Sequence, residues 1–427
     1  MTDRERIVIT GMAVNTPLGD TLDGFYEALL SGRSAITRWR GLDASKIYLK
    51  IGGDLSDYDI AAKALALSAR STEPIAKRLR QLTKRGPWST KLSALLALDA
   101  FLDAGFEAAP MPERFAAIVA GHNLNSNYGV ANGVQFFQEP DFIDPLFGMH
   151  GLDTAQAGTV SELLGIKGPI YTVGAACASG SLALRSAIDE IRHHDADAVL
   201  VVGAVVDFSP IELHSMALMG AVSFLNFNDE PERASRPFDV RREGFVPSHG
   251  GAALVVESLA SARWRGARIY AEVPCVATSC DANHQTQPSE EGQVWLMAKA
   301  LREAGLEPQQ VDYINAHATS TPLGDLAEIR AIKRVFGQHA YQLKINASKS
   351  MLGHTCWSAP TVETVAAILQ MRGGRLHPSI NIDEIDPEVD LDVCAGRSVE
   401  HLTRCIMKNS FGFGGINSVS VLKAFDE

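Results

Sequence analysis

Apolar positions along the chain follow two periods in alternation, from one end to the other. Short runs rich in β-branched residues predict strands, and segments with apolar residues three or four apart predict helices between them. One such helix spans residues 293–304 and ends at Gly305, with Pro308 beyond it. The predicted strands cover residues 6–10, 116–120, 198–206, 252–257, 268–278, 311–316 and 418–425. This alternation predicts an α/β fold with largely buried sheets.

One stretch, residues 55–91, departs from the alternation. It is rich in Lys and Arg, helical in spacing and poor in strand signal, and it therefore predicts a helical excursion on the surface. We find no low-complexity linker and no short-period repeat elsewhere in the sequence. At roughly 150 residues per domain, a chain of 427 residues fits two to three domains or one large domain in two parts.

Composition and charge argue against several classes of protein. Apolar residues make up 46% and charged residues 21%, as in ordinary globular chains. The 39 lysines and arginines against 50 aspartates and glutamates give a net charge of −11, which disfavours nucleic acid as the main partner. The longest apolar run, residues 198–206, is about half of a membrane span, and the charged N-terminus leads into a strand rather than a signal peptide. Six cysteines without disulfide or zinc spacing predict a soluble, cytoplasmic protein in a reducing compartment.

Cys177 stands where a short predicted strand passes through small residues into a predicted helix. The segment reads Tyr-Thr-Val-Gly-Ala-Ala-Cys-Ala-Ser-Gly, and Leu184, Ala187, Ile188 and Ile191 then share one helix face. The helix dipole and the free N–H groups at a helix start favour thiolate over thiol, and small neighbours leave room for a substrate. Free cysteines are more often buried structural residues. This segment alone therefore leaves both interpretations open.

Two histidines stand just past predicted strands, where α/β proteins place their sites. His317 follows the strand at 311–316 in Asn-Ala-His-Ala-Thr-Ser-Thr-Pro, and His354 ends the segment Asn-Ala-Ser-Lys-Ser-Met-Leu-Gly-His. A single histidine there is more often structural, but a cysteine and two histidines in equivalent settings favour a site. Metal binding is the competing use, and we expect no metal because no carboxylate or second cysteine completes a zinc shell. Lys349, among small and apolar residues, is predicted to be partly buried.

A glycine-rich segment at residues 409–415 reads Asn-Ser-Phe-Gly-Phe-Gly-Gly. It lacks the Lys-Ser/Thr of a P-loop, and no dinucleotide fingerprint opens a helix. The segment instead predicts a turn whose backbone approaches another group closely. A backbone N–H in this turn could serve as an oxyanion donor.

These motifs together resemble the β-ketoacyl-acyl-carrier-protein synthases, in the type II, Cys-His-His branch of the thiolase-like condensing enzymes. Residues 7–19 resemble the opening strand and turn of that family, and residues 234–246 resemble its central block. The resemblance covers essentially the whole chain, with the motifs in family order. It implies a thiolase-like fold of two similar α/β halves in five αβαβα layers. We place these halves at residues 1–265, with the nucleophile, and 266–427, with both histidines.

The resemblance also implies catalytic roles. Cys177 would accept an acyl group from a carrier protein as a thioester. His317 and His354 would hold the malonyl thioester carbonyl and promote its decarboxylation, because N–H donors in a dry pocket stabilise the enolate oxygen. Lys349 would orient this constellation and tune its charge. The backbone N–H groups of Cys177 and Phe413 would form the oxyanion hole.

Further positions match the substrate-binding parts of the family. Thr319 and Thr321 match the residues that hydrogen-bond the pantetheine arm, Phe411 matches a gate beside the acyl pocket, and Glu328 matches a structural acid near the site. Trp357 follows His354, where the family places the acyl tunnel, and its ring is predicted either to restrict the tunnel or to pack into the core behind it. No cofactor of its own is implied, because phosphopantetheine arrives on the acyl-carrier protein.

The implied partners are an acyl-carrier protein and a second subunit, in a homodimer or in a heterodimer with a related synthase-like subunit. One candidate for the carrier's docking surface is a run of basic residues without an acidic one. A basic patch could steer the docking of an acidic carrier despite the net negative charge of the chain. The alternative interpretation of this run is a solvated helix face. The run consists of Lys77, Arg78, Arg80, Lys84 and Arg85.

The chain also departs from the family pattern. Residues 247–250 read Pro-Ser-His-Gly where Gly-Glu/Asp-Gly is usual, and Ala318 stands where Gly is frequent. Pro360 is tolerable only in a helix's first turn, which predicts a different start for the helix after His354. Residues 151–165 resemble stand-alone synthase-like proteins of polyketide clusters more than housekeeping members.

Cys177 favours condensation of an acyl group with malonyl-acyl-carrier protein, giving β-ketoacyl-acyl-carrier protein in fatty-acid or polyketide synthesis. Two alternatives stay open. A malonyl-acyl-carrier-protein decarboxylase of a β-branching cassette typically has Ser in place of this Cys, and a non-catalytic chain-length partner subunit commonly lacks it. A CoA thiolase is disfavoured, because its second cysteine would stand in the loop that here carries Phe411 and Phe413.

Overall fold

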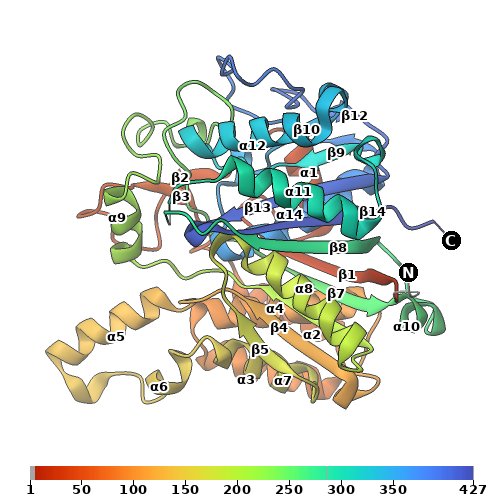
Figure 1. Cartoon of the computed structure of the whole chain (residues 1–427). Helices are drawn as coiled ribbons and strands as arrows, with labels where there is room; N and C mark the ends of the chain where they lie inside the picture. Colours follow the sequence, from red (N-terminus) through yellow and green to blue (C-terminus); the bar gives the residue numbers. More distant parts are fainter. Residues whose placement is uncertain (1–4, 285, 427) are drawn as a thin grey trace.

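The computed structural model describes residues 5–284 and 286–426. At its centre lies β1 (Ile7–Asn15), in which every residue is buried. A strand buried on both faces needs cover on both, and β1 lies inside a ten-stranded sheet with helices on either side (Figure 1). The strand continues past its predicted end at residue 10 through Gly11. A Cβ there would lie 2.4 Å from the carbonyl oxygen of Ala100, so the glycine allows helix α4 (Trp88–Asp103) to pack closely.

The strand order repeats itself in the two parts of the sheet. One part has the order β5-β4-β6-β7-β1 from its edge inward, and the other has the order β10-β9-β13-β14-β8. When the five strands of each part are numbered in chain order, both parts have the spatial order third, second, fourth, fifth, first. In each part the outer three strands run parallel and the inner pairs run antiparallel, and β1 and β8 pair antiparallel where the parts meet. The boundary that we predict between residues 265 and 266 stays a prediction.

The strands of the large sheet are close to the predicted runs, with one exception. That exception is β13, whose second half is polar and which the apolar pattern does not predict. Two small sheets, β2–β3 and β11–β12, lie outside the large one. Besides β1, the strands are β2 (Ile36–Arg38), β3 (Ile51–Gly53), β4 (Phe115–Ala120), β5 (Ile170–Val173), β6 (Ala198–Gly203), β7 (Gly251–Ser258), β8 (Ala271–Cys280), β9 (Tyr313–Asn315), β10 (Lys344–Asn346), β11 (Arg375–Leu376), β12 (Val399–Glu400), β13 (Cys405–Gly412) and β14 (Ile416–Lys423).

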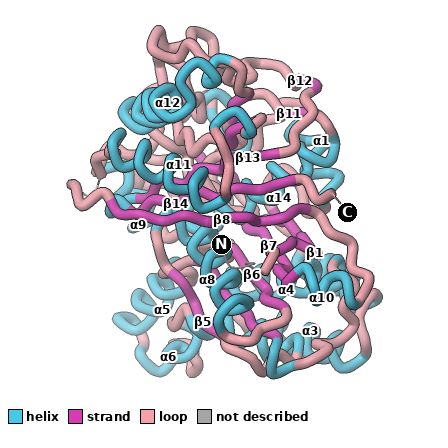
Figure 2. The backbone as a smooth tube through the Cα atoms, turned by 45° about the vertical axis from the view of Figure 1, so that its right-hand side comes forward, coloured by secondary structure: helices cyan, strands magenta, loops and turns pink. Residues whose placement is uncertain are grey.

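Two helices separate the two parts of the sheet. α8 (Ser179–His193) contacts β4 and β6 on one side and β8 on the other, and α14 (Ala359–Gly373) contacts β7 and β13. Figure 2 shows α8 below β8 and beside β6. α14 is buried almost all round, as an apolar helix inside a large protein must be.

Other helices cover the outer faces of the sheet. α4 and α7 (Thr154–Leu164) cover the N-terminal part, and α11 (Glu290–Ala304) and α12 (Pro322–Phe336) lie over the C-terminal part. Helix, sheet, helix, sheet and helix thus form the five-layered αβαβα arrangement that the resemblance implies. The remaining helices are α1 (Leu22–Leu30), α2 (Ile60–Ala69), α3 (Glu73–Arg85), α5 (Ser126–Gln138), α6 (Phe147–His150), α9 (Pro210–Leu218), α10 (Leu259–Trp264) and α13 (Lys349–Leu352).

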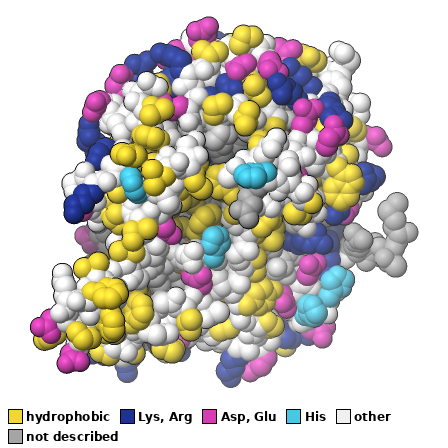
Figure 3. Space-filling view, turned by 60° about the vertical axis from the view of Figure 1, so that its left-hand side comes forward, with side chains coloured by type: hydrophobic (Ala, Val, Ile, Leu, Met, Phe, Trp, Pro, Cys, Tyr) yellow, Lys and Arg dark blue, Asp and Glu magenta, His cyan; other side chains and the backbone are white. Residues whose placement is uncertain are grey.

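The predicted excursion at residues 55–91 is helical, in α2, α3 and the start of α4, although α4 itself belongs to the core. A second excursion, α5 and α6, projects from the N-terminal part (Figure 1) and carries a gathering of apolar side chains on its surface (Figure 3). Over the described ranges, no helix is both long enough and apolar enough to cross a membrane.

Candidate active site

Cys177 lies at the turn that the sequence predicts. β5 ends four residues before it, the short helical turn Ala176–Ala178 contains it, and α8 begins directly after. Ala176 adopts a positive φ of 45°, which is strained for a residue with a Cβ and is typical of functional turns. The side chain of Cys177 faces the cavity described below, although the residue is only 7% exposed.

The expectation that the helix start favours a thiolate is wrong. Burial raises the pKa of the Cys177 thiol to about 11, and the positive charge of Lys349 and the N–H of Phe413 oppose this rise only in part. Desolvation penalises the charged form more than the local donors stabilise it. The neutral thiol form of Cys177 therefore predominates at neutral pH.

The glycine-rich segment forms the hairpin between β13 and β14 and confirms the predicted close approach. A Cβ on Gly412 would lie 3.2 Å from the backbone nitrogen of Cys177 and 3.3 Å from the carbonyl oxygen of Ala175. A side chain at this position would require the turn of the nucleophile to shift by a few tenths of an ångström. With glycine here, the backbone N–H of Phe413 points to the sulfur of Cys177.

The two histidines face each other from different loops. His317 follows β9, and His354 follows α13; their ring centroids lie 5.6 Å apart and the rings are nearly perpendicular, at 84°. The Nδ1 of His354 accepts the backbone N–H of Cys356 at 3.2 Å, so its proton is on Nε2. That Nε2 atom and the Nδ1 of His317 are buried and find no hydrogen-bond partner within the part of the chain that the structure describes. Each ring therefore keeps a nitrogen for a substrate.

Both imidazoles are neutral. Burial holds the pKa of His317 and of His354 well below the ordinary value, and the charge of Lys349 lowers both further. His354 and Lys408 add to the lowering at His317. Neutral imidazoles donate one hydrogen bond and accept another, which is the form that can hold a thioester carbonyl while its oxygen gains charge.

Lys349 is buried more deeply than predicted, at 2% exposure. Its Nζ donates to the carbonyl oxygen of His317 at 2.8 Å and forms an ion pair with Glu363 of α14. Sequence reasoning missed Glu363, whose only signal is an acidic residue in an apolar helix. The second carboxylate oxygen of Glu363 is buried and has no partner among the described residues.

Glu328, predicted as a structural acid, fixes the turn that carries His317. From α12 it accepts the backbone N–H groups of His317 at 2.9 Å and Ala318 at 2.8 Å, and the side-chain amide of Asn409 at 2.8 Å. Burial raises the pKa of this carboxyl, and those donors oppose the rise. The three bonds connect α12, the His317 turn and β13.

One cavity of about 340 Å³ brings most of the predicted residues together. Its mouth carries Met219 and Leu323, which are 56% and 68% exposed. The hydroxyls of the two predicted threonines lie 3.1 Å apart in its wall. The predicted residues that line it are Cys177, His317, His354, Thr319, Thr321, Phe411 and Phe413.

Trp357 is placed differently. Its ring stacks on His122, with centroids 4.2 Å apart and planes 27° apart, and Trp357 is not among the described residues that line the cavity. A substrate-binding role for Trp357 stays a prediction. Pro360 lies in the first turn of α14, as its restricted backbone requires.

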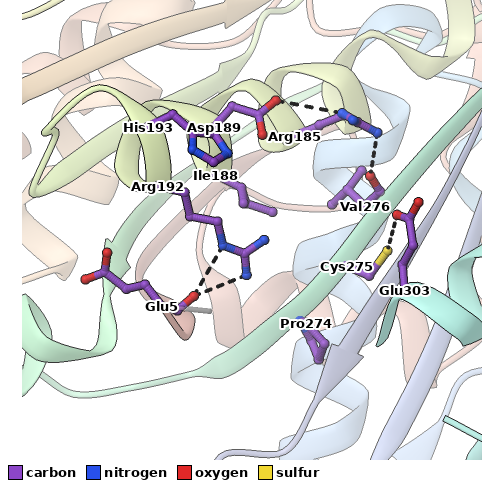
Figure 4. A pocket seen from close by; sticks show the side chains of 10 residues that line it. All are labelled: Glu5, Arg185, Ile188, Asp189, Arg192, His193, Pro274, Cys275, Val276 and Glu303. Atoms are coloured by element: carbon purple, nitrogen blue, oxygen red, sulfur yellow. Dashed lines mark hydrogen bonds and ion pairs between the residues drawn. The ribbon is translucent and has the colours of Figure 1, made fainter. Parts of the chain in front are cut away.

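A larger cleft of about 550 Å³ lies elsewhere, between α8, β8 and α11 (Figure 4). Arg185 lies 3.8 Å from Asp189 in this cleft, and the thiol of Cys275 donates to Glu303 at 3.3 Å. Burial beside that carboxylate raises the pKa of Cys275 to about 12. Unlike Cys177, which faces the backbone N–H of Phe413, this thiol faces a carboxylate that opposes its ionisation. The reactive constellation thus belongs to the smaller cavity at Cys177.

Comparison with known proteins points to one family. The family model described as beta-ketoacyl synthase, N-terminal domain, matches residues 4–262, and the model of its C-terminal domain matches residues 270–383. The chain is 35% identical to 3-oxoacyl-[acyl-carrier-protein] synthase 2 of Coxiella burnetii, over 99% of this chain and 100% of the relative. It is 35% identical to the chloroplastic 3-oxoacyl-[acyl-carrier-protein] synthase I of Arabidopsis thaliana, over 99% and 87%.

Solved structures give the same picture. A complex of a type II polyketide synthase acyl-carrier protein with its ketosynthase bound to the hexaketide matches with a TM-score of 0.84 and 27% identity. The ishigamide ketosynthase/chain length factor matches with a TM-score of 0.87 and 29% identity. Each match covers 99% of this chain and 100% of the other. The thiolase-like fold implied by the sequence is thus confirmed.

Proposed function

Because the chain belongs to the β-ketoacyl synthase family, we propose that it is an acyltransferase that condenses an acyl group on Cys177 with malonyl-acyl-carrier protein. One observation carries the proposal. A neutral thiol, two neutral imidazoles with a free ring nitrogen each, and the N–H of Phe413 meet in one cavity. This set contains a nucleophile, donors for an enolate and a donor for an oxyanion.

The first step loads the enzyme. The sulfur of Cys177 attacks the thioester of an acyl-carrier protein, the bond to the carrier's sulfur breaks, and the proton of the thiol ends on the departing phosphopantetheine thiol. The negative charge that develops on the acyl oxygen is stabilised by the backbone N–H groups of Cys177 and Phe413. This step accounts for a cysteine held next to the Phe413 N–H.

The second step forms the new carbon–carbon bond. The thioester carbonyl of malonyl-acyl-carrier protein accepts hydrogen bonds from His317 and His354 while the bond to its carboxylate breaks and CO₂ leaves. The enolate carbon attacks the acyl group, and the sulfur of Cys177 departs as a thiolate that takes up a proton from solvent. Neutral rings suit this step because they donate to the growing enolate charge.

The proposal assigns no resident cofactor to the protein, since phosphopantetheine arrives on the carrier. The hydroxyls of Thr319 and Thr321, in the cavity wall, are suited to hydrogen-bond the amide groups of its arm. Six free thiols fit a reducing compartment, and we therefore place the reaction in the cytoplasm.

We further propose a second subunit, in a homodimer or in a heterodimer with a related chain. β5 is an edge strand of the sheet, which leaves a row of backbone groups open to a partner strand. Beside it, the projecting α5–α6 segment (Figure 3) exposes apolar side chains, which favours coverage by another protein. The most exposed are Phe137 at 88%, Phe142 at 76% and Met149 at 62%.

Incubation of the protein with an acyl-carrier protein charged with a short acyl group and with malonyl-acyl-carrier protein tests the function. Mass spectrometry of the carrier should find the β-ketoacyl product, with one CO₂ released for each product. Acetyl-acyl-carrier protein as the only product would instead indicate a decarboxylase. A carrier that is unchanged, even after addition of related synthase subunits, would favour a non-catalytic partner subunit.

A further inference from the structure

Lys408 lies on β13 directly beneath the active site. The residue is completely buried, and it is among the largest side chains in the interior. Its Nζ donates to the hydroxyl of Ser181 at 3.1 Å, in the first turns of α8, and to the hydroxyl of Ser410 at 3.0 Å. No carboxylate among the described residues lies within ion-pair distance, 4.0 Å, of this amine. An ammonium group without a direct counter-charge is rare in a protein interior.

Titratable groups face Lys408 from three other elements. The negative charge of Glu363 on α14 stabilises the protonated form of Lys408, and the positive charge of Lys349 on α13 destabilises it. Lys408 pairs in register with Asn315 of β9, two residues before His317, and its charge lowers the pKa of His317. The residues that face it from α8 and β14, Ser181 and Ser420, carry no charge. Glu363, the carboxylate that acts on the amine of Lys408, already pairs with Lys349.

We propose that Lys408 is a positioning residue for the condensation, whose ammonium charge keeps the ring of His317 neutral as the pH falls. The proposal rests on the proposed function, in which a neutral His317 holds the malonyl carbonyl. Lys408 does not line the cavity, so it would act on the substrate only through His317. Its position fits this role because β13 leads into the loop that carries Phe411 and Phe413.

The sign of the effect follows from the charges. A positive group disfavours the protonation of a nearby imidazole, and both Lys408 and Lys349 lower the pKa of His317. Burial lowers the pKa of Lys408 itself to about 7, so its charge is present in acidic solution, where His317 would otherwise protonate. Removing this charge should raise the pKa of His317 by about one unit or more, because at an effective dielectric of about 20 a unit charge roughly 10 Å away already shifts a pKa by about one unit.

A purely structural role makes a different prediction. If Lys408 only tied β13 to α8 through Ser181, its replacement would lower stability without moving the protonation of His317. Two neutral variants, Lys408→Met and Lys408→Gln, separate these roles, since the glutamine keeps a donor for Ser181. Lys408→Arg keeps the charge. Lys423→Met removes a lysine from the adjacent strand β14, three residues beyond the partner of Lys408, and serves as the control.

NMR titration of proteins with ¹³C-labelled histidine rings tests the proposal and needs no substrate. The signal of His317 among the 12 histidines is assigned by its loss in His317→Asn. We expect His317 to protonate about one pH unit higher in Lys408→Met and Lys408→Gln, and at the parent's pH in Lys408→Arg and Lys423→Met. The same midpoint in a folded neutral variant and in the parent would overturn the proposal.

The pH dependence of CO₂ release from malonyl-acyl-carrier protein gives the matching readout. Its acidic limb should move to higher pH in the neutral variants by the same amount as the His317 titration. A shifted His317 signal with no turnover in the parent would contradict the proposed function and leave the role of Lys408 standing. Normal turnover with unshifted signals would contradict the role of Lys408 alone.

Discussion

β4 in the N-terminal part of the sheet and β9 in the C-terminal part hold the same place in the strand order, and a histidine follows each strand by two residues. His317 lines the cavity with Cys177, whereas the ring of His122 stacks on Trp357. Burial lowers the pKa of both, but the neighbouring charges differ in sign. Asp153 and Glu212 favour the protonated form of His122, and Lys349 and Lys408 disfavour that of His317. The fold thus places a histidine just past the end of each of these two strands. The neighbouring charges determine which of the two is suited to the chemistry.

The third strands of the two parts differ in the same way. β5 leads to Cys177 and α8, and β10 leads to Lys349 and then His354 before α14. One part therefore supplies the nucleophile and the other supplies the cation and the donors. The cavity has its full set of groups only because α8 and α14 bring the two strand ends together in the central layer.

Replacement of each histidine with alanine should show the largest difference between the two positions. His317→Ala should lower CO₂ release from malonyl-acyl-carrier protein by about 10²–10³-fold, the usual cost of one lost donor at a developing charge. His122→Ala should lower it far less, because His122 is not among the described residues of the cavity wall. Both rates are measured with saturating substrate on folded protein. Equal losses in the two variants would mean that the cavity is not the site.

The buried ion pair between Lys349 and Glu363 in the C-terminal part predicts a large loss of stability in Glu363→Gln. This change leaves the ammonium of Lys349 buried without its carboxylate, which typically costs about 3–5 kcal/mol. Glu388→Gln, which breaks an ion pair with Arg330 on the exposed face of the same part, should change stability little. Urea unfolding of both variants checks this. A midpoint for Glu363→Gln at or above that of Glu388→Gln would refute the buried pair.

How far the sequence predicts the molecule can be judged from individual residues. Apolar runs predict β4, β6 and β7 nearly to their ends, but not β13, whose Lys408, Asn409 and Ser410 are polar and nonetheless buried. Burial of polar residues is set by the layers packed on both sides of a strand, and a local pattern does not contain that information.

The site shows the same limit. Strand-end motifs predict Cys177, His317 and His354, because small residues and turns leave a clear local mark. Glu363 is missed, since an acid on a helix ordinarily indicates a solvated face. The protonation of Cys177 is predicted wrongly, because the helix start is a local feature whereas the burial that outweighs it comes from the tertiary structure.

Exposed basic residues differ between the surfaces of the two parts. We expect a smaller effect on activity from changing them. On α3 in the N-terminal part, Arg78 donates to α7 carbonyls and Arg80 pairs with Glu73, whereas Lys84 is exposed. Lys84→Glu should raise KM for carrier-bound substrates several-fold, and less at high salt, because acyl-carrier proteins are acidic. Arg397→Glu on the C-terminal part is the matched control. Equal KM values in the two variants would remove α3 as the docking surface.

The smallest effect on activity is expected for Trp357→Ala. Because the ring stacks on His122, its loss should leave the chain-length profile of acyl loading unchanged while lowering the thermal stability. Loading of Cys177 is followed by mass spectrometry over a series of acyl chain lengths. Longer chains entering the variant alone would show that the ring closes an acyl tunnel.

The central claim is that the N-terminal part supplies the nucleophile, Cys177, to a cavity completed by the C-terminal part. Incubation with an acyl-acyl-carrier protein, followed by protease digestion and peptide mass spectrometry, tests this directly on all six cysteines. The account predicts the acyl increment on the peptide of Cys177, and no increment on any cysteine in Cys177→Ala. An acyl thioester on another cysteine, or an adduct that persists in Cys177→Ala, would contradict it.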